Sequence, residues 1–275
     1  MKLQICRVPG GNFGDDLNAI LWSALFPDLL ESGNPAVVFG IGSILGGDYP
    51  STHQKIVLGA GLGYKKIRPL DSSWDVRWVR GRLSARALGL SDDLALGDSV
   101  LLWPELRPSE GGDNRIGLIP HHASWKSYNW HTIAGQAGLL AINPTASPDE
   151  VRRQLLRCRT VLTESLHGAI FADCMRIPWQ AVALSYRFNR FKWKDWLSIT
   201  GLEFVHTNTP FPLVTKLHRM AGLKNCLAKT LRPDSDTRLN SLRPLHAAIE
   251  PECAAVVDFL TQAAANDRFF RMSNA

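Results

Sequence analysis

The polar side chains best suited to chemistry lie within TVLTESLHGAIFADC (residues 160–174), where one apolar segment ends and another begins. The first segment is short and rich in β-branched residues, which predicts a strand, and the second predicts a helix buried on most sides. Glu164 and His167 stand at the junction. A helix N-terminus has free N–H groups and a partial positive charge, so this junction suits an anionic ligand. The carboxyl and the imidazole could transfer protons there.

A purely structural role is the alternative for the same stretch. Thr163 and Ser165 can cap the helix, and His167 can then be a histidine of the core. Gly168 lacks a side chain, so either a ligand or another segment of the protein could approach it closely. The residues by themselves leave both interpretations open.

A second polar cluster, IPHHASWKSYNW (119–130), follows another predicted strand. His121 and His122 could bind a metal ion, but no Asp, Glu or Cys cluster lies nearby to complete a ligand set. We therefore expect no metal site, and we expect these histidines and Lys126 to bind an anion.

A third cluster, GGNFGDDLNAILW (10–22), follows the first predicted strand. It resembles a phosphate-binding loop but has neither of the glycine motifs that define such loops. Instead, Asp15 and Asp16 stand at the start of a predicted helix. Two carboxylates there would repel phosphate and would suit sugar hydroxyls or proton abstraction. The alternative is that both aspartates only cap the helix.

A fourth cluster, YRFNRFKWKDW (186–196), interleaves Arg187, Arg190 and two lysines with aromatic residues. Such a pattern can bind sugars, single-stranded nucleic acid or a membrane interface. In an ordinary solvated helix or loop the aromatic side chains would be exposed, which is unusual. We therefore interpret this stretch as a binding segment.

The elements that must position these clusters follow from the alternation of short, glycine-bounded apolar runs with helical patterns. This alternation predicts an α/β fold with parallel sheets, in which ligands bind beyond the carboxyl ends of the strands. The predicted strands are residues 3–8, 36–42, 55–61, 76–81, 115–122, 139–144, 160–165 and 179–184. The predicted helices are residues 15–26, 83–89, 149–158 and 166–176.

A polar stretch rich in Gly and Pro, ELRPSEGGDN (105–114), predicts a linker. We expect one α/β domain at residues 1–108 and a second at 109–230. Residues 231–275 are expected to form a helical tail, since an apolar stripe recurs at helical spacing in residues 251–265.

Composition restricts the class of protein. The net charge of +6 is spread along the chain, which favours an anionic small molecule or a membrane surface over nucleic acid. Five cysteines without a CxxC pair argue against a zinc ribbon or a disulfide framework. The N-terminus lacks the apolar segment of a signal peptide, and no run is long enough to span a membrane. We expect a cytoplasmic protein, in peripheral contact with the inner face of the membrane.

Four motifs in consistent order resemble the polysaccharide pyruvyl transferases, and in particular the ketal pyruvyl transferases of succinoglycan-type exopolysaccharides. The motifs are GNFGDDLN, VRGRLSARALGL followed by GDSVLLWP, IGLIPHH, and LTESLHGAIFADCMRIPWQAV. The resemblance implies two Rossmann-like domains in a GT-B-like arrangement, with phosphoenolpyruvate as donor and no cofactor. It also implies a saccharide acceptor linked to undecaprenyl diphosphate.

The resemblance further implies roles for individual residues. His167 would bind the donor or act as the acid, Glu164 would share the acid role, and Asp15 or Asp16 would be the base. Many members of the family carry an arginine where this chain has Ser165, so other cations must meet the donor's charge. Candidates for that charge are Arg80, Arg82, Lys126 and Arg187. The residues expected to contact substrate are Asn12, Ser165, Gly168, His121, His122, Lys126, Arg82, Arg187 and Arg190.

Two other functions fit the same sequence features. A GT-B glycosyltransferase would use a nucleotide sugar on the same architecture and would bind UDP but not phosphoenolpyruvate. A non-catalytic sugar- or phosphate-binding module would bind its ligand and never release inorganic phosphate.

Overall fold

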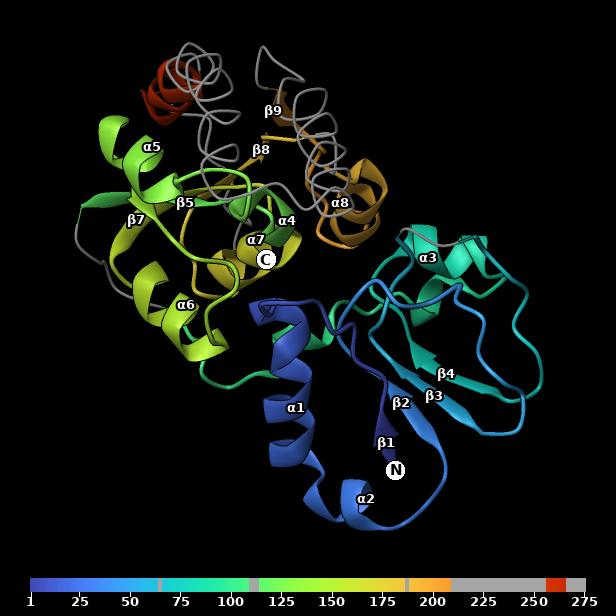
Figure 1. The fold of residues 1–275 in the computed structure, drawn as a ribbon. Coiled ribbons are helices and arrows are strands. Elements are labelled where there is room, and N and C mark those ends of the chain that lie inside the picture. Colours follow the sequence, from blue (N-terminus) through green and yellow to red (C-terminus); the bar gives the residue numbers. More distant parts are fainter. Residues whose placement is uncertain (64–65, 109–113, 186–187, 209–255, 266–275) are drawn as a thin grey trace, which may run out of the picture.

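The computed structural model describes residues 1–63, 66–108, 114–185, 188–208 and 256–265. In these residues the chain forms an α/β structure with two separate parallel sheets (Figure 1). The predicted α/β class with parallel sheets is therefore confirmed.

The first sheet contains four parallel strands in the order β1-β2-β3-β4. Its strands are β1 (Lys2–Leu3), β2 (Val37–Phe39), β3 (Lys55–Leu58) and β4 (Trp74–Trp78). The helices of this half are α1 (Phe13–Leu25), α2 (Pro27–Glu31) and α3 (Arg82–Ala87), with 3₁₀ helices η1 (Asp92–Leu94) and η2 (Ser99–Leu102).

The second sheet contains five parallel strands in the order β6-β5-β7-β8-β9. Its strands are β5 (Arg115–Ile119), β6 (Leu140–Ala141), β7 (Cys158–Thr163), β8 (Trp179–Ala183) and β9 (His206–Asn208). The helices are α4 (His122–Trp125), α5 (Trp130–Gln136), α6 (Pro148–Leu155), α7 (Leu166–Cys174) and α8 (Arg190–Leu197). The central strand β7 is buried at every residue except Arg159, as expected for a parallel strand covered on both faces.

Helix α1 joins the two halves. It follows β1 along the chain but packs against α6 and α7 of the second half (Figure 1). Phe13 meets Phe171 edge to face with ring centroids 4.8 Å apart, and Leu17 belongs to the same buried cluster as Ile170. A second contact between the halves is made by α8, which packs on α3. The polar ends of α1 and α7 are thereby brought together.

Several predicted elements change length or environment in the structure. The first strand, predicted at 3–8, covers only Lys2–Leu3, and the pairing of β9 beside β8 was not predicted. Trp193 and Trp196 of α8 are each 1% exposed. The interpretation of these aromatics as a binding surface is therefore wrong, because they lie three residues apart on one buried helix face.

Along the chain, the strands of the first sheet precede residues 109–113 and those of the second sheet follow them. Residues 109–113 themselves fall outside the described residues. The domain limits at 108 and 230 stay predictions. Most of the predicted tail is also outside, except for a helix at residues 256–265 that adds Phe259 and Leu260 to the core beside the second sheet. None of the helices in the described part of the chain has the length and apolar character needed to cross a membrane.

Candidate active site

The start of α7 has a helix cap, and two of its residues also line a pocket. Ser165 is the N-cap residue, and its Oγ accepts a hydrogen bond from the N–H of Gly168 at 3.4 Å. The Thr163 hydroxyl accepts from the N–H of Ser165 at 3.0 Å. A Cβ on Gly168 would lie 2.5 Å from Thr163 Oγ1, so this glycine permits close packing within the protein. Gly168 does not line the pocket described below, whereas Ser165 and His167 do.

His167 is held between helices of both halves. It is 8% exposed and meets the ring of Phe13 edge to face at 6.4 Å. A Cβ on Gly14 would overlap the imidazole, so α1 can pass here only with a glycine at this position. On another side, Nε2 lies 3.8 Å from Oδ2 of Asp98, the N-cap residue of η2.

The two aspartates at the start of α1 have different environments. Asp15 is 7% exposed, lines the pocket and accepts a hydrogen bond from Asn12 Nδ2 at 2.6 Å. Asp16 instead accepts from the backbone N–H of Asn12 at 2.8 Å and does not line the pocket. Burial raises the pKa of Asp15, partly offset by the charges of His167 and Lys192. Asp16 therefore binds the backbone of the N-cap residue Asn12, and Asp15 is the aspartate that faces the pocket.

The paired histidines lie across the pocket from α1. His121 is the N-cap residue of α4, and its Nδ1 accepts from the N–H of Ala123 at 3.3 Å. Its ring lies 4.1 Å from the ring of His122, measured between centroids, and both rings line the pocket. Two adjacent imidazoles that line a pocket can donate hydrogen bonds to an anion.

Glu164 lies behind these histidines and is absent from the pocket lining. It is 2% exposed; its carboxylate accepts from the N–H of His121 at 2.9 Å and from Ser185 Oγ at 2.6 Å. Burial raises the pKa of Glu164, against these hydrogen bonds. The side chain thus fixes the loop between β5 and α4, and its predicted share in acid catalysis stays a prediction.

The predicted cations are dispersed. The fully buried Arg80 reaches the pocket lining, but its guanidinium pairs with Asp195 at 2.9 Å. Lys126 Nζ donates to the carbonyl of Pro9. Arg82 and Arg190 are exposed and do not line the pocket, and Arg187 lies outside the described residues.

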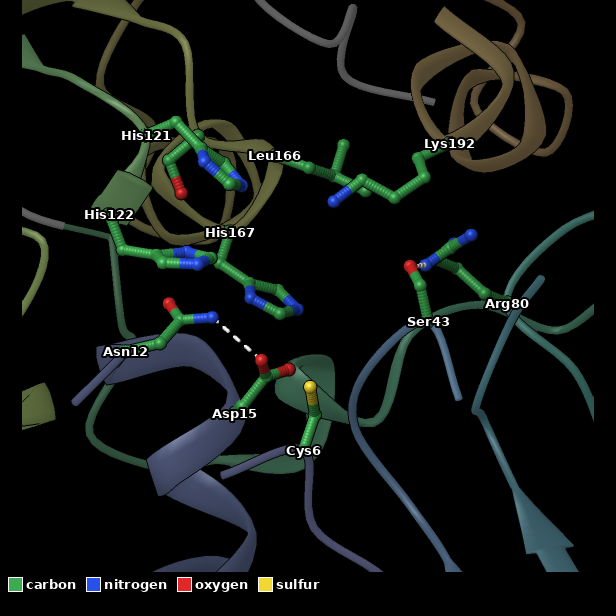
Figure 2. A pocket seen from close by; sticks show the side chains of 11 residues that line it. Cys6, Asn12, Asp15, Ser43, Arg80, His121, His122, Leu166, His167 and Lys192 are labelled. Atoms are coloured by element: carbon green, nitrogen blue, oxygen red, sulfur yellow. Dashed lines mark hydrogen bonds between the residues drawn. The ribbon is translucent and has the colours of Figure 1, made fainter. Parts of the chain in front are cut away.

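Lys192, which the sequence analysis did not select, lines the pocket from α8. Figure 2 shows its amino group directed toward the space between the histidines and Arg80. The sequence offered a weak signal, because Lys192 is one of several cations in the segment 186–196. Asp98 was also missed, although it occurs in the quoted motif GDSVLLWP.

Both halves of the protein contribute to this pocket (Figure 2). Its lining residues are Cys6, Asn12, Asp15, Ser43, Arg80, His121, His122, Ser165, Leu166, His167 and Lys192. Among the residues that the structure describes, no three His, Cys, Asp or Glu side chains are grouped to hold a metal ion. The pocket therefore offers imidazoles, one buried carboxyl and cations for binding an anion and transferring protons.

Comparison with known proteins points to one family. The family model described as polysaccharide pyruvyl transferase matches residues 8–186. The succinoglycan biosynthesis protein ExoV of Rhizobium meliloti (strain 1021) is 34% identical to this chain over 216 residues. That match covers 76% of this chain and 68% of the relative. The matched family segment includes the pocket residues from Asn12 to His167.

Proposed function

Because the chain belongs to the polysaccharide pyruvyl transferase family, we propose that it transfers the enolpyruvyl group of phosphoenolpyruvate to two hydroxyls of a sugar. Phosphate is released, and the product is a cyclic pyruvyl ketal. The observation that carries this proposal is the pocket in which His167, Asp15 and Lys192 converge from three helices.

Binding of the donor needs positive charge and hydrogen-bond donors around its phosphate and carboxylate. We assign this task to Lys192, His121 and His122, whose side chains line one pocket. Arg80 contributes less, because its guanidinium already donates to Ser43, to the carbonyl of Leu62 and to Asp195. In this assignment Lys192 supplies the positive charge that an arginine provides in many family members at the position of Ser165.

The chemistry begins with protonation of the donor's methylene carbon, and the electron pair of its double bond forms the new C–H bond. The adjacent carbon becomes cationic, and the first sugar hydroxyl adds to it and loses its proton. The bond to phosphate then breaks, and the second hydroxyl adds and loses its proton to close the ketal. His167 is assigned as the acid. Asp15 is assigned as the base, since a raised pKa makes a carboxylate a better base.

The acceptor in this proposal is a saccharide of an exopolysaccharide repeat unit, carried on undecaprenyl diphosphate at the inner face of the membrane. The name of the Rhizobium relative, a succinoglycan biosynthesis protein, supports the acceptor class. The two parallel sheets with a pocket supplied by both halves support a GT-B-like arrangement. A cytoplasmic location is part of the same proposal. The acceptor would enter from the side of α1.

The test is to incubate the purified chain with phosphoenolpyruvate and a panel of lipid-linked oligosaccharides. Expected results are release of inorganic phosphate and a gain in acceptor mass of one pyruvyl ketal. The control is His167→Ala, which should lose at least about a hundredfold in turnover while staying folded. Binding of UDP without any use of phosphoenolpyruvate would instead indicate a glycosyltransferase. Binding of phosphoenolpyruvate without phosphate release from any acceptor would indicate a binding module.

A parallel incubation with EDTA tests the expected independence from metal ions. Turnover should persist. If EDTA abolished turnover and zinc or manganese restored it, His121 and His122 would become candidate ligands.

A further inference from the structure

Two buried polar atoms face each other beside the pocket without a hydrogen bond. Oδ2 of Asp98 and Nε2 of His167 are each inaccessible to solvent and have no hydrogen-bond partner in the described residues. They lie 3.8 Å apart. A buried polar atom without a partner is costly, and native proteins keep few of them. Here two such atoms occur in one contact, which points to a shared role.

The position of Asp98 is fixed independently of His167. Its Oδ1 accepts a hydrogen bond from the N–H of Val100 at 3.1 Å, which caps η2. The side chain is fully buried. Capping uses only one of the two carboxylate oxygens, so it does not explain why Oδ2 is directed at an imidazole.

The other surroundings of His167 restrict its ring. Gly14 of α1 leaves no room for a side chain beside Nδ1. The charged and titratable groups near the ring are Asp15 from α1, Asp98 from η2 and, in the same pocket, Cys6, Arg80, Lys192, His121 and His122. Asp98 lies 3.8 Å from Nε2.

We propose that Asp98 is a positioning residue for His167, accepting a hydrogen bond from Nε2–H and so selecting one tautomer. Such bonds are often long in the free enzyme and tighten when substrate binds. The selected tautomer leaves Nδ1 as the unprotonated ring nitrogen, which can accept a proton. A carboxylate in this place also stabilises the imidazolium form. The part of the proposal that concerns turnover rests on the proposed pyruvyl transfer, whereas the Asp98–His167 pairing does not.

The pairing is tested in the free protein by 15N NMR of the histidine rings, with the His167 signals assigned by their loss in His167→Gln. In the wild type, His167 should show the Nε2–H tautomer, with an Nε2 shift typical of a hydrogen bond to a carboxylate. Asp98→Asn should change both nitrogen shifts, because asparagine preserves the cap on Val100 but presents an amide in place of the charge. Unchanged His167 shifts in this variant would overturn the proposal, whatever the activity of the protein.

The effect on catalysis is tested by steady-state kinetics of Asp98→Asn. Turnover should fall about a hundredfold or more, with KM for phosphoenolpyruvate changed by less than about threefold, because orientation of the acid is lost and the donor contacts remain. Normal turnover with a normal KM would contradict the proposal.

Asp173→Asn is the matched control. Asp173 is 5% exposed and lies on α7, the helix that carries His167, where it accepts from Trp179 Nε1 at 3.4 Å, outside the pocket. Its substitution should leave turnover and the His167 signals unchanged. If Asp98→Asn does not fold, Asp98→Ser serves instead, since serine also caps a helix. If the wild type shows no transfer to any acceptor, the proposed function fails and the NMR result still decides the pairing.

Discussion

Two buried aspartates, Asp195 and Asp98, each face a basic side chain but differ in how completely their carboxylate oxygens are hydrogen-bonded. Asp195 accepts hydrogen bonds from Arg80 Nε at 3.1 Å and from the N–H and Oγ of Ser84, each at 2.7 Å. These bonds tie α8 to α3 and so join the two halves. Asp98 faces His167 with one oxygen that has no hydrogen bond.

The difference separates a carboxylate that holds the fold from one that is available to the reaction. Both side chains are inaccessible to solvent, so burial does not distinguish them. What distinguishes them is whether every oxygen has a donor. The carboxylate of Asp195 is occupied by the fold because each of its oxygens has a donor, whereas the unsaturated Asp98–His167 contact can change its hydrogen bonding during turnover.

The largest expected effect is on stability and comes from the saturated pair. Asp195→Ala leaves Arg80 buried without its counter-charge, so the free energy of unfolding should fall by about 3–5 kcal/mol. Denaturation in urea measures it. The control is Asp92→Ala, which removes the exposed partner of Arg86 and should change stability far less. A loss for Asp195→Ala no larger than for Asp92→Ala would remove the distinction between the pairs.

The next effect concerns Asp15, a third buried carboxyl, which shares with Asp98 its place beside His167. Asp15→Asn should lower turnover about a hundredfold, the scale of a lost general base, with donor affinity by calorimetry nearly unchanged. Asp16→Asn should keep turnover within about threefold, because Asp16 lies outside the pocket and an amide oxygen can still accept from the N–H of Asn12. Turnover close to wild type in both variants would show that neither carboxylate is the base.

Gly14→Ala disturbs the Asp98–His167 contact while keeping both residues. The new methyl group would overlap the imidazole, and a displacement of about 1 Å is enough to cost about a hundredfold in turnover. We place it after Asp15→Asn because α1 can shift to relieve part of the overlap. Gly135→Ala in α5 is the control, because a Cβ there meets no atom within 4 Å. Full activity in Gly14→Ala would mean that the position of His167 is not critical.

The smallest effect is a change of stability with pH. Burial raises the pKa of Asp15 above its ordinary 3.8, so the folded state holds this proton more tightly than the unfolded state does. The resulting stabilisation is complete below the unfolded pKa and is lost as pH rises through the folded pKa. Asp15→Asn cannot lose a proton, so its melting temperature relative to wild type should increase between about pH 4 and pH 7. A constant difference across that range would contradict the direction of the shift.

Local patterns in the sequence were sufficient for the junction between β7 and α7. A strand pattern, a hydroxyl cap and an apolar helix are encoded within fifteen consecutive residues, so Ser165 and His167 could be placed at a helix start. The same reasoning could not separate Asp15 from Asp16, because only the helix geometry decides which of two neighbours faces the pocket.

Contacts between distant segments could not be derived in this way. Asp98 reaches His167 only because α1 and η2 pack against α7, and such packing leaves no periodic signal near Asp98. Lys192 had a signal that was misread. The segment was interpreted as exposed aromatics, whereas Trp193 and Trp196 are buried and Lys192 beside them lines the pocket.

The packing of α1 also has a consequence for synthesis of the chain. The residues that cover Phe13 and Leu17 belong to α6 and α7, which begin at Pro148 and Leu166. At a synthesis rate of about 5–20 residues per second, the apolar face of α1 stays without these partners for several seconds after it leaves the ribosome. We expect the nascent first half to expose aromatic surface during that interval, which chaperones can bind, and to complete its folding only when the second half has emerged.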